Sequence, residues 1–110
     1  MNDKNYPPIA LGTWSWGVGV SGGDQVFGNH LDMAELRPVF EAAMAHGLCL
    51  WDTAAAYGMG ASEKIVGSLA KEYPRSEVIL STKFTPRLAG SAEDPMKDMC
   101  EESLRRLQTD

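Results

Sequence analysis

Apolar residues gather in three short runs along the chain, and each run predicts a β-strand. The runs are "PIALGT" at 8–13, "LCLWDT" at 48–53 and "EVILSTKF" at 77–84. In the third run Val78, Ile79 and Leu80 are consecutive and apolar, which is typical of a strand covered on both faces. The longer segments that follow each run leave room for a helix after each strand.

Between the first two runs, apolar residues recur at the spacing of an amphipathic helix. They are Met33, Leu36, Val39, Phe40, Ala43 and Met44. Asp32 and Glu35 resemble a capping box ahead of this helix, and Gly47 suits its C-terminal end. Pro38 removes a backbone hydrogen-bond donor, so it predicts either a kink or a short turn at 32–36 before the helix proper.

Two further helices are predicted, over "SEKIVGSLAKEY" (62–73) and "DPMKDMCEESLRRL" (94–107). Ser62 is the expected N-cap of the first, and Asp94 followed by Pro95 is expected to open the second. The expected apolar faces are Ile65, Val66, Leu69 and Tyr73 in the first helix, and Met96, Met99, Cys100 and Leu107 in the second.

The resulting order alternates strand and helix, which predicts an α/β fold with right-handed crossovers and parallel strands. The 110 residues fit one domain, 1–110, and no fourth strand follows the third helix pattern, so the domain is expected to be partial. The Gly-rich segment 14–31 is expected to form a loop at the carboxyl edge of the sheet. Its "GVGVSG" (17–22) matches a dinucleotide-binding fingerprint, but no strand directly precedes it and no helical pattern follows, which favours a flexible loop.

Composition narrows the class of protein. Fifteen acidic and ten basic residues give a net charge of −5 without a basic cluster, which argues against nucleic acid and anionic membranes as partners. No apolar run approaches the ~18 residues of a membrane helix, and "MNDKNYPP" lacks the pattern of a secretion signal. Cys49 and Cys100 have no metal-ligand spacing, so reduced core thiols in a cytoplasmic protein are expected, ahead of a disulfide or a metal site.

Three ionisable residues follow the predicted strands. Asp52 ends the second strand, Tyr57 lies in the loop after it, and Lys83 is near the end of the third. Because the carboxyl ends of parallel strands form the functional face of such folds, Asp52 and Lys83 are expected to lie within reach of each other. Taken singly, each has an ordinary interpretation: a turn-forming aspartate, a surface tyrosine and a lysine at a sheet edge.

Together the three residues predict a proton donor. A phenol is a poor acid at neutral pH because its pKa is about 10, but a neighbouring ammonium favours the phenolate and lowers that pKa. Asp52 would hold Lys83 charged, and Tyr57 could then protonate a developing alkoxide. This chemistry fits the reduction of a carbonyl group. Trp14 and Trp16 are either a wall for substrate or cofactor or packing residues.

Three stretches, "LGTWSWG", "WDTAAAYGMGASEKIVGSLAK" and "VILSTKF", resemble the aldo-keto reductases in the same order and spacing. The central stretch is similar to the family motif D-T-A-x-x-Y-G, followed by a glycine-flanked S-E-x-x-x-G. The resemblance covers nearly the whole chain. It implies the N-terminal three βα units of a TIM (β/α)8 barrel, incomplete as given. Trp51 lies in the second predicted strand and is expected in core or barrel packing.

The resemblance also implies an NADPH-dependent oxidoreductase that reduces aldehydes or ketones through an Asp–Tyr–Lys–His tetrad. By resemblance Tyr57 is the general acid, Lys83 lowers its pKa and Asp52 supports Lys83. The expected cofactor contacts are Gly12, Thr13, Trp14 and Asp52.

The tetrad histidine of the family lies just past a fourth strand, and neither His30 nor His46 fits that place, so both are expected at the surface. A TIM barrel needs ~250 residues, so the chain alone is expected to be inactive.

An alternative function stays open. The same motif resembles the branch of the family that includes potassium-channel β subunits, which implies a non-catalytic or regulatory binding module, or a truncated remnant. The unpaired edge of the third strand predicts self-association of the chain, because an apolar edge offers free backbone donors and acceptors.

Overall fold

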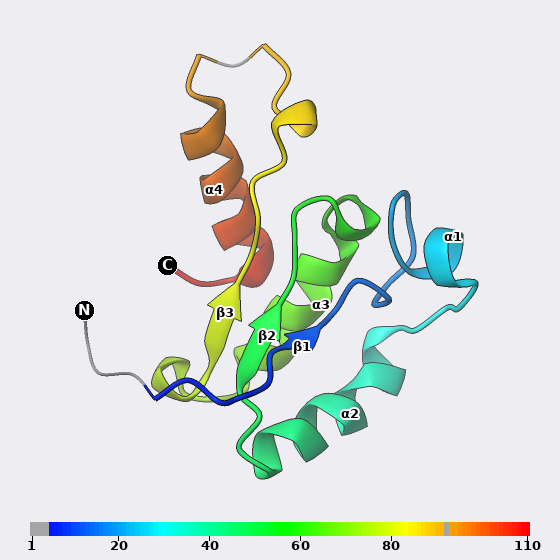
Figure 1. Ribbon diagram of the computed structural model, residues 1–110, viewed down its shortest axis with the longest axis vertical. Helices are drawn as coiled ribbons and strands as arrows, with labels where there is room; N and C mark the ends of the chain where they lie inside the picture. Colours follow the sequence, from blue (N-terminus) through cyan, green and yellow to red (C-terminus); the bar gives the residue numbers. More distant parts are fainter. Residues whose placement is uncertain (1–4, 92) are drawn as a thin grey trace.

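The computed structural model describes residues 5–91 and 93–110, and Figure 1 shows their arrangement. Strands β1 (Leu11–Gly12), β2 (Leu50–Asp52) and β3 (Ile79–Ser81) pair in parallel in the order β1-β2-β3. Each strand covers only the middle of the apolar run that predicts it. The α/β class and the parallel sheet are therefore confirmed.

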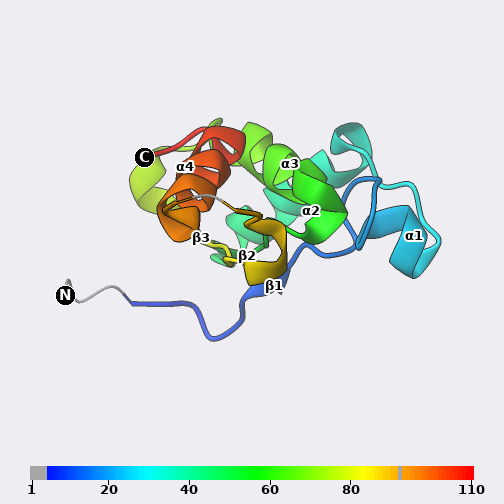
Figure 2. The same cartoon turned by 90° about the horizontal axis from the view of Figure 1, so that it is seen from above.

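Helices α2 (Met33–Ala45), α3 (Ala61–Ala70) and α4 (Pro95–Leu107) lie on one side of this sheet, as Figure 2 shows. A shorter helix, α1 (Gly23–Phe27), and three 3₁₀ turns complete the elements: η1 (Tyr57–Gly60), η2 (Arg75–Glu77) and η3 (Pro86–Leu88). Among the described residues, no helix is both long and apolar enough to cross a membrane.

Helix α2 runs unbroken through Pro38, so the expectation of a separate turn at 32–36 is wrong. Pro38 is exposed, and water can satisfy the carbonyl that loses its helical partner. The Asp32 side chain accepts from Glu35 N, as expected for an N-cap. Gly47 ends the helix with a φ of +77°, which the left-handed cap requires, and its N–H donates to Met44 O across 3.1 Å.

Helix α4 opens as expected, with Asp94 as N-cap and Pro95 first. The expectation for α3 is wrong, because its N-cap is Gly60 and Ser62 lies fully buried inside the first turn. The two helices pack closely at Gly67, where a Cβ atom would come within 2.6 Å of the Leu107 backbone. Only glycine permits this approach.

The core lies between the sheet and the helices. Trp51 is fully buried, as expected, and stacks on Phe40 with ring centres 4.2 Å apart. Trp16 packs against the same indole at 5.4 Å and is 5% exposed, which makes it a core residue. The remaining large members of the core are Leu36, Val66, Leu69, Val78 and Leu107.

Several residues expected inside lie outside. Val39 in α2 and Met96 in α4 are 52% and 62% exposed, so the apolar face of each helix is narrower than its pattern predicts. Cys100 is exposed and Cys49 only half-buried, which corrects the expectation of core thiols, although both are free cysteines.

In β3, Ile79 and Leu80 are likewise only half-buried, which corrects the expectation of a strand covered on both faces. The reason is the position of β3 at the edge of the sheet, with the helices on one face only.

The Gly-rich segment 14–31 is more ordered than expected, because α1 begins directly after Gly22. It does not form a dinucleotide fingerprint, since β1 ends at Gly12, well before the glycine run. Instead the segment packs on the turn after β2. A Cβ atom on Gly22 would lie 2.5 Å from Gly58 N, and one on Gly19 would lie 2.7 Å from Gly58 O.

Candidate active site

The structure brings Asp52 and Lys83 together at the carboxyl ends of neighbouring strands. Asp52 is the last residue of β2, and Lys83 follows β3 by two residues. Lys83 Nζ donates to Asp52 Oδ1 across 2.7 Å and to the Thr53 carbonyl across 2.9 Å. Both charged side chains are partly exposed, at 47% for Lys83 and 35% for Asp52, so the pair faces an open end of the sheet.

Tyr57 completes this cluster. The Lys83 ammonium lies 5.3 Å from the centre of the Tyr57 ring, within the range of a cation–π contact. The surroundings raise the pKa of Lys83 above 10.5: partial burial, the largest single influence, lowers it, but the hydrogen bond and charge of Asp52, with a contribution from Tyr57, outweigh the burial. Lys83 is therefore a cation held between a carboxylate and a phenol.

A tight turn delivers Tyr57 to this position. The small residues Thr53, Ala54 and Ala55 are buried beneath it, and Tyr57 N donates to Ala54 O across 3.2 Å. The chain then passes through three consecutive left-handed residues, Gly58, Met59 and Gly60, of which Met59 has a φ of +52°. Such a conformation is strained for a residue with a side chain, so surrounding contacts must hold the turn in place.

Trp14 also contacts Tyr57. The two rings stack with centres 5.7 Å apart and an angle of 21° between their planes. Phe27 of α1 meets the indole edge-on at 5.3 Å, and Trp14 Nε1 donates to Ser21 O across 2.6 Å. Trp14 is still 45% exposed, so this side of the phenol has an aromatic wall open to solvent.

The two predicted residues before Trp14 also lie at this end of the sheet. Thr13 is fully buried, and its N–H donates to the backbone carbonyl of Asp52 across 3.0 Å. A Cβ atom at Gly12 would meet nothing within 4 Å, so there is open space beside the strand end. His30 and His46 are both exposed, as expected, and the His46 ring bonds to Ala42 O at the end of α2.

Sequence reasoning missed two groups of site residues. Phe27 lies in a segment without helical periodicity, so no pattern points to its contact with Trp14. The sequence pattern predicts only a helix N-cap at Ser62 and no role for Glu63, although a fully buried carboxylate needs a specific partner. The signal that could have found it is the acidic residue inside an otherwise small and apolar stretch.

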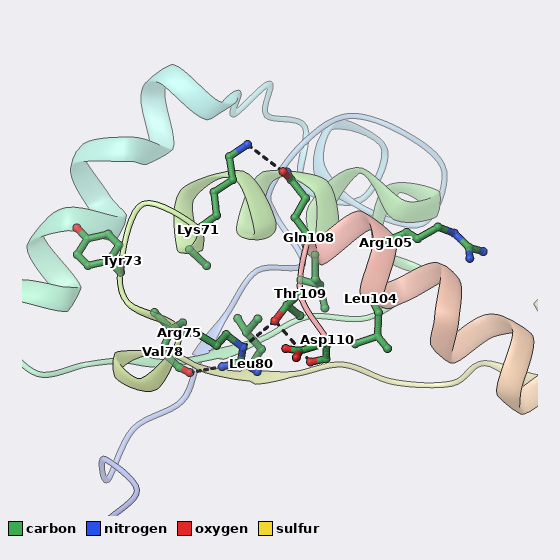
Figure 3. Close-up of a pocket in the computed structure, with 12 residues that line it drawn as sticks. Lys71, Tyr73, Arg75, Val78, Leu80, Leu104, Arg105, Gln108, Thr109 and Asp110 are labelled. Carbon is green, nitrogen blue, oxygen red and sulfur yellow. Dashed lines mark hydrogen bonds between the residues drawn. The ribbon is translucent and has the colours of Figure 1, made fainter.

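A separate groove lies away from this cluster (Figure 3). It has a volume of about 670 Å³ and lies between α3, the start of β3 and the end of α4. Lys71 Nζ donates to Gln108 Oε1 across 2.9 Å at its rim, and Arg75 Nε donates to Thr109 Oγ1 across 2.7 Å. Among the described residues, the groove lining contains no member of the cluster around Tyr57.

Comparison with known proteins places this cluster in a family context. The model of the "Aldo/keto reductase family" matches residues 8–110. The chain is 40% identical to aldo-keto reductase YhdN of Bacillus subtilis, a match that covers 93% of this chain and 31% of the relative. It is 32% identical to a chloroplastic pyridoxal reductase of Arabidopsis thaliana, covering 100% of this chain and 32% of that protein.

Solved structures agree with this match. An aldo-keto reductase from Klebsiella pneumoniae in complex with NADPH is 37% identical, with a TM-score of 0.72, over 96% of this chain and 32% of that one. The thermostable aldo-keto reductase Tm1743 is 26% identical, with a TM-score of 0.74, over 98% of this chain and 36% of that one.

The chain thus spans about a third of the proteins that it matches. The matched solved structures are (β/α)8 barrels. The match of the family model over nearly the whole chain, together with these relatives, shows that the chain belongs to the aldo/keto reductase family of oxidoreductases.

Proposed function

We propose that this chain carries the proton-donating part of an NADPH-dependent carbonyl reductase. The observation that supports this proposal is the position of the Lys83 ammonium, bonded to Asp52 and 5.3 Å from the Tyr57 ring. The substrates are aldehydes or ketones, which become alcohols by gain of a hydride at carbon and a proton at oxygen. The relatives are named reductases, which fits this reaction class.

Each residue has one task in this scheme. Tyr57 donates its proton to the oxygen of the carbonyl as negative charge develops there. The Lys83 ammonium attracts the phenolate charge that forms on Tyr57, which lowers the barrier to that transfer. Asp52 keeps Lys83 charged and in place. The Trp14 ring stacks on the phenol and offers an apolar surface to the substrate.

NADPH would supply the hydride, and the open end of the sheet suits such a group. The space beside Gly12 is empty to 4 Å, and Trp14 offers a flat exposed ring. Among the described residues, no hydrogen bond reaches the second carboxylate oxygen of Asp52, so that oxygen can accept from a ribose hydroxyl. We therefore propose Gly12, Thr13, Trp14 and Asp52 as the cofactor contacts. Two Klebsiella pneumoniae relatives solved with NADPH or NADP support the choice of cofactor.

We also propose that the chain acts as the first three βα units of a longer barrel in the cytoplasm, and is inactive alone. Neither His30 nor His46 lies with Tyr57 and Lys83, so the fourth member of the family tetrad would come from another part of the barrel. The mass of the intact protein in its native source tests this directly. A mass near three times that of the 12.0 kDa chain supports the proposal, and a mass of 12.0 kDa contradicts it.

Replacing the phenol tests the reaction itself. In the full-length protein, Tyr57→Phe should lower carbonyl reduction by roughly 10²–10⁴-fold, the usual contribution of a general acid, while NADPH affinity stays within about twofold because the ring remains. Tyr73→Phe is the matched control, since Tyr73 packs on Phe40 away from the cluster. Turnover that survives in Tyr57→Phe would refute the role of Tyr57.

One relative favours a second candidate function. The chain is 29% identical to a probable voltage-gated potassium channel subunit beta of Arabidopsis thaliana, over 93% of this chain and 32% of that protein. A regulatory binding module would bind NADPH yet reduce none of a panel of aldehydes and ketones. That result in the wild-type full-length protein would favour the module over the reductase.

A further inference from the structure

A threonine directly follows each of the three strands. Thr13 comes after β1, Thr53 after β2 and Thr82 after β3. Every one of these hydroxyls bonds to the first turn of α3, at Ser62 or Glu63. The carboxyl ends of all three strands are thus tied to one point on one helix.

Ser62 serves the first two strands. Its Oγ donates to the Thr13 carbonyl across 2.8 Å, and lies 2.7 Å from Thr13 Oγ1 and 3.0 Å from Thr53 Oγ1. All three side chains are fully buried, and buried hydroxyls that share hydrogen bonds have few alternative arrangements. The backbone ladder also continues here, because Thr13 N donates to Asp52 O and Thr53 N donates to Ser81 O.

Glu63 serves the third strand. Thr82 Oγ1 donates to Glu63 Oε2 across 2.8 Å, and Arg106 Nε donates to Glu63 Oε1 across 2.7 Å. Glu63 is fully buried, and a buried carboxylate is tolerated only when its charge is paired and both oxygens are engaged. The Arg106 side chain passes over Gly60, where a Cβ atom would lie 2.7 Å from Arg106 Cδ. Arg106 of α4 therefore holds the Glu63 carboxylate in place, and this carboxylate in turn holds Thr82 at the end of β3.

We propose that Ser62 and Glu63 are positioning residues for the site, which set the places of Trp14, Asp52 and Lys83 through the three threonines. Each threonine is the chain neighbour of one of these residues: Thr13 precedes Trp14, Thr53 follows Asp52 and Thr82 precedes Lys83. The effect of these residues on catalysis rests on the proposed reductase function. The hydrogen bonds between the threonines and α3 do not depend on it.

The consequence follows from the geometry required for proton transfer. A displacement of about 1 Å in a reacting group can cost ~10²-fold in rate, and Lys83 lies two residues beyond the end of β3. The Thr82–Glu63 bond is the contact that fixes the residue next to it. Loss of this bond would let the ammonium drift from Asp52 and Tyr57 without unfolding the protein.

The first test removes that single bond in the full-length protein. Thr82 is exposed, so Thr82→Val should fold, while it keeps the shape and loses the hydroxyl. We expect kcat for carbonyl reduction to fall about 10-fold or more, with the KM for the carbonyl substrate and the Kd for NADPH within about twofold of wild type. Thr82→Ser should restore most of the lost kcat, and Thr85→Val, at a threonine without a side-chain cap bond, is the matched control.

A second readout does not depend on activity. NMR of ¹³C-methylated lysines reports the pKa of Lys83, which the contact with Asp52 raises. In Thr82→Val this pKa should fall back toward the ordinary lysine value, and in Thr85→Val it should not move. If the wild-type protein reduces no carbonyl compound, the proposed reductase fails, but the pKa comparison still tests the tie.

A separate pair of variants tests the role of Ser62. Ser62→Ala should lower kcat more than Ser68→Ala, a substitution on the same helix at a hydroxyl that accepts a hydrogen bond from the exposed Gln108 side chain. The inference is overturned if Thr82→Val leaves both kcat and the pKa of Lys83 at wild-type values. It is equally overturned if Thr82→Val and Ser62→Ala lower the melting temperature alone, because that result would mean a purely structural role.

Discussion

Lys83 and Asp52 are 31 residues apart in the chain, yet the ammonium of one donates to the carboxylate of the other across 2.7 Å. The register of the sheet explains this contact. Asp52 lies opposite Ser81 in the β2–β3 pair, and Lys83 follows Ser81 by two residues, the repeat that returns a side chain to the same face of a strand. The pair is therefore a consequence of parallel strand order and of the loop that continues β3.

The first prediction concerns the charge of Lys83. Lys83→Met keeps the length of the side chain and removes the ammonium that stabilises the Tyr57 phenolate, so kcat should fall by about 10²-fold or more, as for removal of one oxyanion donor. Steady-state kinetics on the full-length protein measure this change. Lys71→Met is the control, since Lys71 bonds to Gln108 away from the site. Equal kcat values for the two variants would contradict the role of Lys83.

The second prediction is a pH dependence of stability. Because Asp52 and Tyr57 raise the pKa of Lys83 above 10.5, against the effect of partial burial, the folded protein holds this proton more tightly than the unfolded chain. The stabilising contribution is fully present below the ordinary lysine pKa and is lost as the pH rises through the raised value. The pair is exposed enough for screening, so the contribution is about 0.5 kcal/mol or less.

Denaturant unfolding of wild type and Lys83→Met at a series of pH values checks this. The charge-dependent part of the difference in unfolding free energy between the two should be constant from neutral pH to about 10 and should be lost above the raised pKa. A difference that grows in strongly alkaline solution would contradict the assigned direction of the pKa shift.

The third prediction concerns the aromatic wall. Trp14 stacks on Tyr57, and a pair of this kind contributes about 0.5–1.5 kcal/mol beyond its buried area. We propose the exposed part of this ring as a surface for the substrate, where a contact of similar size would form. Trp14→Ala should then raise the KM for carbonyl substrates about 2–10-fold, whereas Trp14→Phe should keep most of the affinity. Kinetics with one aromatic and one aliphatic aldehyde measure the effect. Wild-type KM values in Trp14→Ala would mean that the indole only packs on the phenol.

The fourth prediction concerns the core. Phe40 is fully buried and stacks on Trp51, so Phe40→Ala should lower the unfolding free energy by about 3–5 kcal/mol. Val39→Ala, its exposed neighbour in α2, should change it by no more than about 0.5 kcal/mol. Thermal and denaturant unfolding of the two variants give the comparison. Similar losses of unfolding free energy in both variants would contradict the burial of Phe40 and the exposure of Val39.

The amino-acid sequence predicts the order and type of the main elements because those depend on local patterns. The apolar runs around Trp51 and Leu80 indicate strands. Asp32 and Asp94 mark helix starts, because the side chain of each accepts a hydrogen bond from the backbone N–H three residues later. The pairing of Asp52 with Lys83 could also be anticipated, since parallel strands bring their carboxyl ends to one edge. These features need no knowledge of distant contacts.

Only the tertiary structure decides which side chains meet across elements. It places Trp16 in the core and Trp14 on Tyr57, although only Ser15 separates the two tryptophans in the same loop. It buries Ser62 and Glu63 between strands and α4, where local reasoning places a simple helix cap. The physical reason is that periodicity records which face of an element is apolar but not what packs against that face, so contacts between residues far apart in the chain follow from the fold alone.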